Sequence, residues 1–222
     1  MSDEYLPLNC PPLDQLLGGG VERGIITEIY GAGGTGKTNL CIQAARAAAS
    51  RGDKVVFVDT EGVSQTRMSQ VFGESKKLME KLLLFNPYSI EEQETMVEKA
   101  LKINAGLILI DSINLYYRLG IESEEGAATR SLTRQLVSLQ VIARKKNIPV
   151  LITAQVYSTG EEVKPFGGRC IDHMAKTVVR LEKIENGEKK EKKESRQATL
   201  VKHRAQPGGK TTRFYITASG LE

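Results

Sequence analysis

Gly31-Ala-Gly-Gly-Thr-Gly-Lys37-Thr38 is the stretch that decides the fold of this 222-residue chain. The β-branched run Ile25–Tyr30 precedes it and predicts a buried strand, and the Ala-rich stretch Lys37–Ser50 follows it and predicts a helix. The eight residues fit the pattern G-x-x-x-x-G-K-[ST], in which glycines let backbone N–H groups surround phosphate oxygens at a helix N-terminus. An accidental glycine-rich turn is the alternative, and the strand–turn–helix context argues against it. The sequence therefore predicts a loop that binds the phosphates of a nucleotide.

This loop also predicts a magnesium site. We expect Lys37 to place its charge on the β- and γ-phosphates and the Thr38 hydroxyl to bind Mg²⁺. Asp111 ends the apolar run Leu107–Asp111, where a carboxylate emerges at the ligand-binding edge of a parallel sheet, and we expect it to hold Mg²⁺ through water. An ordinary strand-end aspartate is the alternative. The residues expected to contact ATP are Gly31, Ala32, Gly33, Gly34, Thr35, Gly36, Lys37, Thr38 and Asn39.

Two polar residues follow other predicted strands at the same edge. Glu61 comes after the run Asp53–Asp59 and is the candidate base for the attacking water. Gln155 comes after the run Pro149–Ala154 and is the candidate sensor of the γ-phosphate, although a glutamine that only satisfies a strand end would look the same. Together with Lys37, these residues form the predicted catalytic set.

The rest of the chain alternates strand and helix signals until about residue 170. Apolar runs predict the strands Asp53–Asp59, Leu82–Phe85, Leu107–Asp111 and Pro149–Ala154. Caps and helical periodicity predict the helices Ser64–Phe72, Ser89–Ile103 and Thr129–Lys146. Three strands without helices then follow, with Glu185–Arg196 expected as a hairpin loop: Lys176–Lys183, Gln197–Lys202 and Thr212–Thr217. The pattern predicts one α/β domain over residues 1–222, with a mostly parallel sheet, helices on both faces and an antiparallel C-terminal edge.

Composition excludes several classes of protein. Hydrophobic residues make up 40% and charged residues 26%, which excludes a disordered chain. No apolar run approaches the about 18 residues that a membrane helix needs, and the acidic start does not resemble a secretory signal. Three scattered cysteines indicate reduced thiols, and we expect a cytoplasmic protein.

Charge is distributed unevenly along the chain. Residues 164–222 hold 14 Lys and Arg against 7 Asp and Glu, a net charge of +7 on a chain whose total is +4. This basic part fits a polyanion such as nucleic acid, and a solvated hairpin is the equally simple alternative. With no Trp and only 5% aromatic residues, we do not expect a surface that stacks bases on aromatic rings.

Four ordered motifs resemble a known family. They are Leu13–Gly31 leading into the phosphate loop, Val58-Asp-Thr-Glu-Gly62, Leu109-Ile-Asp-Ser112 and Thr153-Ala-Gln-Val156. In this order they resemble the ATPase core of the RecA/RadA/Rad51 recombinase family, from about Leu6 to Leu221, and the short form is similar to an archaeal paralogue within it. The resemblance implies a P-loop fold of RecA type.

The resemblance also implies roles for particular residues. Glu61 matches the family's catalytic glutamate, and Gln155 matches the glutamine that couples ATP to DNA binding. The segment Leu119–Gly126 lies where the family has its first DNA-contact loop, and Ser158–Arg169 lies where it has the second. Lys164 and Arg169 would then contact DNA phosphates, with plain surface turns as the alternative.

Lys202 and Arg204 raise a separate possibility. They resemble the Lys-x-Arg pair with which circadian KaiC-type relatives reach the γ-phosphate of a neighbouring subunit, which would make them a finger in trans. The alternative is that these are two solvent-exposed basic side chains on an edge strand, with no role in catalysis.

The chain also departs from the full-length recombinases. The phosphate loop begins about thirty residues in, which leaves no room for an N-terminal helical DNA-binding domain or a polymerisation motif. We therefore expect an accessory protein of homologous recombination and repair that binds ATP, Mg²⁺ and single- or double-stranded DNA without sequence specificity. It would hydrolyse ATP weakly, modulate a RadA-type recombinase and have no membrane partner, and it could form a homodimer. A KaiC-like signalling ATPase or autokinase that acts without DNA is the main alternative, and a small-molecule P-loop kinase would need an arginine-rich lid.

Overall fold

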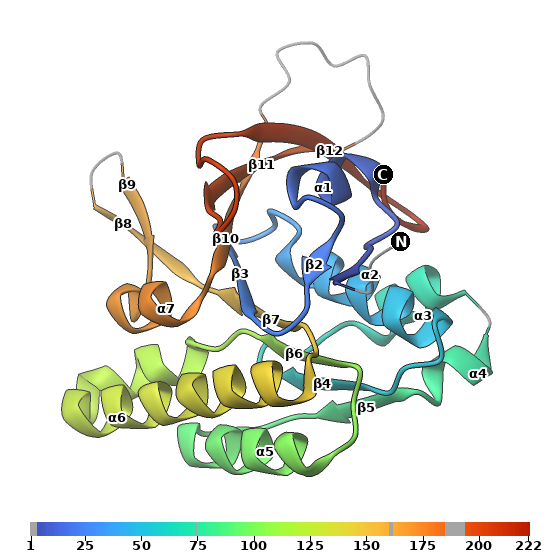
Figure 1. Cartoon of the computed structure of the whole chain (residues 1–222). Coiled ribbons are helices and arrows are strands. Elements are labelled where there is room, and N and C mark those ends of the chain that lie inside the picture. The colour runs from blue at the N-terminus through green and yellow to red at the C-terminus, as the bar shows by residue number, and fades with distance from the viewer. Residues whose placement is uncertain (1–3, 74, 160–161, 185–193) are drawn as a thin grey trace.

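A twisted central sheet organises the molecule, as Figure 1 shows for the computed structural model, which describes residues 4–73, 75–159, 162–184 and 194–222. Within these residues the sheet has nine strands. In spatial order they are β13 (Gly220–Leu221), β12 (Thr211–Thr217), β11 (Glu194–Lys202), β10 (Thr177–Lys183), β3 (Ile26–Gly31), β7 (Val150–Ala154), β6 (Leu107–Asp111), β4 (Val55–Asp59) and β5 (Leu82–Phe85). The strands from β10 to β5 run parallel and those from β10 to β13 antiparallel, which confirms the predicted fold class.

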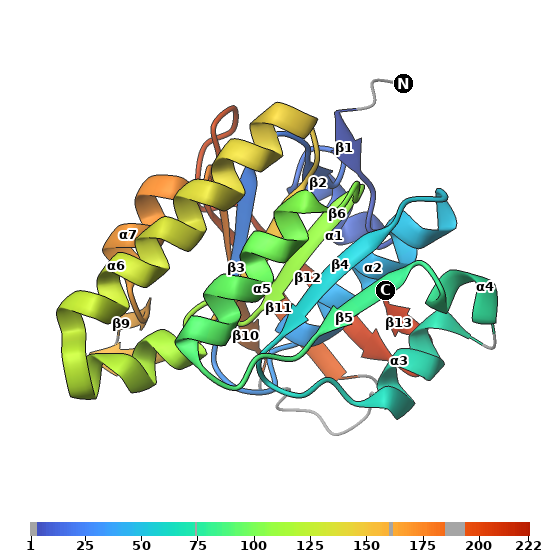
Figure 2. The same ribbon diagram turned by 90° about the horizontal axis from the view of Figure 1, so that it is seen from below.

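Helices cover both faces of this sheet. One face carries α1 (Pro11–Leu16), α2 (Lys37–Ser50), α3 (Gln65–Phe72) and α4 (Lys76–Met79). The other carries α5 (Ile90–Lys102), α6 (Leu115–Lys146) and α7 (Gly168–Met174). Figure 2 shows α5 and α6 side by side across the front of the strands. Two small ribbons complete the fold: β1 (Tyr5–Leu6) with β2 (Val21–Glu22), and β8 (Val156–Thr159) with β9 (Glu162–Pro165).

The central strands are mostly apolar and buried because both of their faces are covered, although Thr27, Glu28 and Thr153 are buried polar exceptions. In β4, Val55 and Phe57 pack into the core under α2, whereas Val56 and Val58 pack into the core under α5 and α6. Side chains of neighbouring residues point to opposite faces of a strand, so each strand contributes to both cores. This burial fixes the register, and the register sets where each strand ends and where its polar terminal residue emerges.

The predicted helix starts are confirmed at two caps. The Ser89 hydroxyl accepts the Glu92 N–H at 3.2 Å at the start of α5, and the Ser64 hydroxyl accepts the Arg67 N–H at 3.3 Å at the start of α3. Each serine satisfies a backbone donor that the helix itself leaves without a partner.

Both expected DNA-contact loops are wrong as loops. Leu119–Gly126 lies within α6, which begins 14 residues before the predicted Thr129 and consists of two helical segments joined at a kink at Glu124. The segment contains three glutamates and a leucine, which favour a helix, and its two glycines cost only about 1 kcal/mol each. Much of Ser158–Arg169 forms the hairpin of β8 and β9, with Tyr157 paired to Lys164, and α7 follows.

Smaller differences concern the C-terminal strands and the cysteines. β11 begins at Glu194, so the last residues of the expected hairpin loop Glu185–Arg196 belong to the strand, and residues 185–193 lie outside the described residues. The three cysteines are unpaired, and burial raises the pKa of the Cys10 thiol to about 11. Of the helices in the described part of the chain, none combines the length and apolarity needed to cross a bilayer.

Candidate functional site

The phosphate loop connects the end of β3 to the start of α2, as predicted. Gly36 has φ +104°, a left-handed conformation that suits glycine. Position 31 requires glycine for a different reason. A Cβ there would lie 2.3 Å from the carbonyl oxygen of Leu181 on β10. Any larger residue at Gly31 would therefore push the loop away from the sheet. Both glycines explain why the backbone can form a tight turn at this point.

Lys37 lies inside this loop. Its side chain is buried, and its Nζ donates hydrogen bonds to the carbonyl oxygens of Gly31 at 2.8 Å and Ala32 at 3.1 Å. The Thr35 hydroxyl donates to the same Ala32 oxygen at 2.9 Å. The loop is thus already folded around an ammonium group, which is the arrangement that a nucleotide phosphate requires.

Asp111 is fully buried at the end of β6, in the register position beside Asp59 of β4. Burial raises the pKa of its carboxyl to about 6, although the neighbouring Thr153 and Thr38 hydroxyls lower it. Its Oδ1 accepts a hydrogen bond from the Thr153 hydroxyl, whereas its Oδ2 is buried without a hydrogen-bond partner among the described residues. A buried polar atom is rarely left without a partner, and a cation with oxygen ligands would supply one. The residues present therefore fit a magnesium ion.

Glu61 is positioned by a turn that Asp59 organises. The Asp59 carboxylate accepts the backbone N–H groups of Glu61 at 3.2 Å, Gly62 at 2.8 Å and Val63 at 2.7 Å. Thr60 ties the same turn to the end of β6, because its hydroxyl accepts the Ser112 N–H at 2.8 Å. The Glu61 side chain is consequently exposed at the edge of the sheet.

Gln155 meets Glu61 across this edge. The Gln155 Nε2 donates to Glu61 Oε1 at 2.9 Å. A cavity of about 340 Å³ opens between them and the loop, and the residues that line it are Gly31, Ala32, Gly33, Lys37, Glu61, Arg118, Gln155, Val156 and Ser158. The structure thus brings the three predicted catalytic residues to one cavity, with Thr38 and Asp111 beside it on α2 and β6.

Several residues at this site were missed by sequence reasoning. Arg118 lines the cavity and donates to Gln155 Oε1 at 3.2 Å. Asn114, at the N-cap of α6, accepts the Gln155 N–H at 2.8 Å. Arg67 of α3 donates to the Asn39 side chain at 2.5 Å, beside the first turn of α2. None of these residues belongs to a motif, and their partners are 28 or more positions away in the chain.

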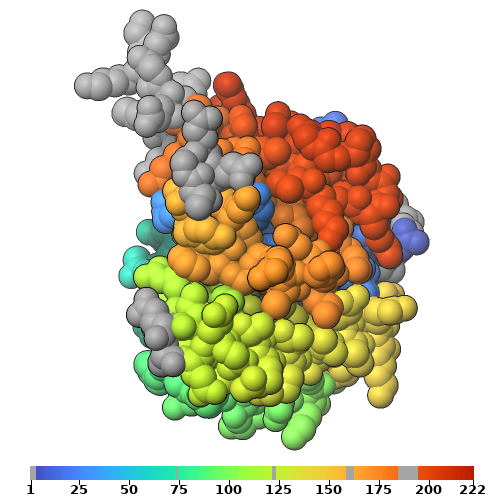
Figure 3. All heavy atoms as spheres, turned by 90° about the vertical axis from the view of Figure 1, so that its left-hand side faces the viewer, coloured from blue at the N-terminus to red at the C-terminus, as the bar shows by residue number. Residues whose placement is uncertain are grey.

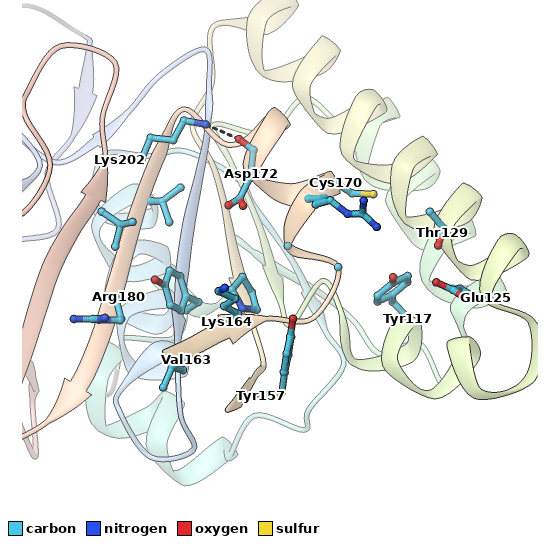
Figure 4. Close-up of a pocket in the computed structure, with 17 residues that line it drawn as sticks. Tyr117, Glu125, Thr129, Tyr157, Val163, Lys164, Cys170, Asp172, Arg180 and Lys202 are labelled. Carbon is cyan, nitrogen blue, oxygen red and sulfur yellow. Dashed lines mark hydrogen bonds between the residues drawn. The ribbon is translucent and has the colours of Figure 1, made fainter. Parts of the chain in front are cut away.

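A second and larger hollow of about 1030 Å³ lies on the face formed by α6, α7 and the hairpin β8–β9 (Figure 3). We call it the basic cavity, after four of the residues that line it: Lys164, Arg169, Arg180 and Lys202. Glu125 and Asp172 also line it, so cations outnumber acids. Figure 4 shows Glu125 and Thr129 projecting from α6 on one side and Arg180 from β10 on the other. Both predicted DNA contacts, Lys164 and Arg169, are therefore found at one hollow.

Lys202 and Arg204 make their contacts within the chain. Lys202 Nζ donates to the carbonyl oxygens of Asp172 at 2.5 Å and Ala175 at 2.9 Å, at the C-terminal end of α7 (Figure 4). Arg204 forms an ion pair with Glu22 of β2. Neither residue lines the cavity at the phosphate loop. A finger in trans stays a prediction, and these contacts account for both side chains without a neighbouring subunit.

The comparisons with known proteins agree with this architecture. The family model Rad51 matches residues 6–221. A protein named DNA repair and recombination protein RadB from Methanococcoides burtonii is 42% identical, over 98% of this chain and 97% of its own length. The protein of the same name from Thermoplasma acidophilum is 39% identical, over 94% of this chain and 90% of its own length. A solved structure described as the crystal structure of the RadB recombinase superposes with a TM-score of 0.82 at 32% identity and covers 98% of both chains. The chain therefore belongs to the Rad51 family.

Proposed function

We propose that this protein is an ATP-dependent DNA-binding accessory factor of homologous recombination and DNA repair. The names of its relatives, DNA repair and recombination protein RadB, support the process. One structural observation carries the mechanism: Lys37, Glu61 and Gln155 surround a single cavity, and Gln155 directly precedes the hairpin that carries Lys164. A nucleotide at the loop would thus lie next to the segment that leads to the basic cavity.

The chain's own residues supply most of the nucleotide chemistry. The backbone N–H groups of the loop and the ammonium of Lys37 would bind the phosphates. Glu61 would accept a proton from the attacking water or orient it, since its carboxylate is exposed at the cavity. Magnesium, when bound, would neutralise charge on the phosphate oxygens, held by Thr38 and, through water, by Asp111. We expect slow hydrolysis, because Arg118 is the one cation besides Lys37 among the described residues that line this cavity.

DNA binding would take place at the basic cavity. Lys164 and Arg169 present charge toward a hollow large enough for a backbone segment, and phosphates carry no sequence information. Non-specific binding to single or double strands follows. The protein partner would be a RadA-type recombinase, and light scattering would show whether the chain also forms a homodimer.

The test is a DNA titration followed by fluorescence anisotropy, at two salt concentrations, with ATP and Mg²⁺, with ADP and Mg²⁺, and without nucleotide. A phosphate-binding protein must lose affinity steeply as salt rises. We expect such a loss and a different DNA affinity in the presence of ATP. Salt-independent binding, or the same affinity in all three nucleotide states, would contradict the proposal.

A further inference from the structure

Arg118 lies between the two cavities. It is on the first turn of α6, where its backbone N–H donates to the Asn114 carbonyl oxygen at 3.0 Å, and its side chain is exposed. Among the described residues that line the cavity at the phosphate loop, Lys37 and Arg118 are the two cations. Lys37 is buried and bound to two loop carbonyls, whereas the Arg118 side chain is exposed.

On the nucleotide side, Arg118 fixes the orientation of the Gln155 amide. A guanidinium only donates hydrogen bonds, so its contact at 3.2 Å selects the amide oxygen of Gln155. The amide nitrogen is then turned toward Glu61, to which it donates at 2.9 Å. The order of the three side chains follows from their donor and acceptor groups, and a change at one of them has to change the others.

On the DNA side, Arg118 contacts an aromatic pair. Its guanidinium carbon lies 5.4 Å from the ring centroid of Phe166, which is the range of a cation–π interaction. The Phe166 ring in turn lies 5.0 Å, centroid to centroid, from Tyr157. Tyr157 lines the basic cavity and is paired with Lys164 across the hairpin. Arg118 therefore touches Gln155 directly, and it is linked to the basic cavity through Phe166 and then Tyr157.

The backbone around this contact is held in place by Asn114. The buried Asn114 side chain accepts the Gln155 N–H at 2.8 Å and donates to the carbonyl oxygens of Gln155 at 2.9 Å and Phe166 at 3.0 Å. The backbone N–H of Phe166 also donates to the backbone carbonyl oxygen of Gln155 at 3.1 Å. With the two backbone segments joined, the parts that are left to respond to a phosphate are the side chains of Gln155 and Arg118.

We infer that Arg118 is a positioning residue that transmits the presence of a γ-phosphate from Gln155 to Phe166 and the hairpin. A terminal phosphate carries the negative charge that both the Gln155 amide N–H and the guanidinium favour, and it repels Glu61. It therefore draws Gln155 away from Glu61 and moves Arg118 relative to the Phe166 ring. This inference rests on the proposed function for its biological role, but the side-chain response itself requires only nucleotide.

A tryptophan reporter tests this response without DNA. The chain has no tryptophan, so Phe166→Trp introduces a single indole opposite Arg118 and keeps an aromatic face for the cation. We expect its emission to change with a non-hydrolysable ATP analogue and Mg²⁺ but not with ADP and Mg²⁺. Adding Arg118→Gln should abolish this difference, and Arg118→Lys should retain part of it. Arg144→Gln, at an exposed arginine in the last turn of the same helix, is the matched control and should leave it unchanged. An emission that ignores the γ-phosphate, or a difference that survives Arg118→Gln, overturns the inference.

A second measurement separates this inference from the proposed function. Calorimetry first shows that Arg118→Gln still binds ATP, which confirms a folded loop. The variant should then lose the ATP-dependent difference in DNA affinity while its nucleotide-free affinity and salt dependence match the wild type. A nucleotide-free salt slope lowered by about 0.7 would instead make Arg118 a direct phosphate contact and overturn the positioning role. If the wild type itself shows no ATP-dependent DNA affinity, the proposed function fails, and the tryptophan reporter still decides the inference.

Discussion

The nucleotide edge and the basic face differ in how their side chains are positioned. At the nucleotide edge, Glu61, Asp111 and Gln155 each follow or end a buried parallel strand, so the register of the sheet places them together. At the basic face, Lys164 lies on a hairpin whose strand β9 contacts β3, and Arg169 lies on the short helix α7, which packs against α6. The first arrangement depends on strand ends that a motif marks. The second depends on packing between segments that no motif marks.

The largest effect is expected from Lys37→Ala, which removes the buried ammonium from the loop. Loss of a charge-assisted hydrogen bond to phosphate should weaken ATP binding by roughly 10- to 100-fold. The ATP-dependent part of DNA binding should disappear, with nucleotide-free DNA affinity unchanged. Calorimetry and anisotropy measure both quantities, and Lys145→Ala, at an exposed lysine near the end of α6, is the control. If Lys37→Ala kept the ATP response, the two regions would not be coupled through this loop.

Asp111→Asn should separate stability from function at the same edge. Because burial raises the pKa of Asp111 to about 6, the ionised carboxylate destabilises the nucleotide-free fold at neutral pH, and this penalty is relieved as the pH falls from about 6 toward 4. The variant should therefore have a higher melting temperature than the wild type at pH 7 and a smaller advantage near pH 4. Each kcal/mol recovered corresponds to roughly 2–4 °C for a chain of this size.

The same variant should lose the extra stability that the wild type gains from ATP with Mg²⁺. Thermal melts with and without Mg²⁺·ATP measure this gain directly. An Asp111→Asn protein that keeps the full ligand-dependent gain would rule out the magnesium role of this carboxylate, and one that melts lower than the wild type without ligand would contradict the burial penalty.

Substitutions at the basic face should have the reverse effect of Lys37→Ala: DNA affinity should fall and ATP affinity should not change. Lys164→Ala and Arg169→Ala should each lower DNA affinity and reduce the slope of log K against log salt by about 0.7 on single strands, because one phosphate contact is lost. ATP affinity should stay at the wild-type value, since neither residue lines the nucleotide cavity. Anisotropy over a range of salt concentrations gives the slope. Unaltered slopes in both variants would place DNA elsewhere on the molecule.

The sequence predicts best those parts of the fold that a local motif or an uninterrupted run of residues marks. The bounds of α2, β5 and β6 were predicted without error, because each is an uninterrupted run with a glycine, a cap or a polar residue at its end. The groups around Gln155 were not predicted in full. Arg118 and Asn114 are 37 and 41 positions from that residue, and nothing in their own neighbourhood marks them.

The N-terminal part of α6 was missed for another reason. Family position suggested a loop at Leu119–Gly126, and this outweighed the helix-forming composition of the segment. The short elements α1, α4 and α7 contain too few residues for a helical period to be recognised.

The smallest expected effect comes from Gly126→Ala, which tests whether the segment Leu119–Gly126 is helical. Gly126→Ala should stabilise the chain by up to about 1 kcal/mol if the residue is helical, because alanine loses less backbone entropy than glycine. An added Cβ would meet only the end of the Arg130 side chain, at 3.2 Å. Gly209→Ala is the contrasting control, since its φ of +89° should make the same change unfavourable. Chemical denaturation measures both changes in the free energy of unfolding. A Gly126→Ala variant less stable than the wild type would favour an irregular segment at this place.

The proposed coupling between nucleotide and DNA depends above all on a triphosphate binding at the loop around Lys37, and calorimetry of the wild-type protein with ATP tests this most directly. Titrations at two temperatures, with and without Mg²⁺, guard against an enthalpy that happens to vanish at one of them. We predict one binding site per chain, with affinity that rises when Mg²⁺ is present. The absence of binding heat at both temperatures, with Mg²⁺ present, would contradict the account.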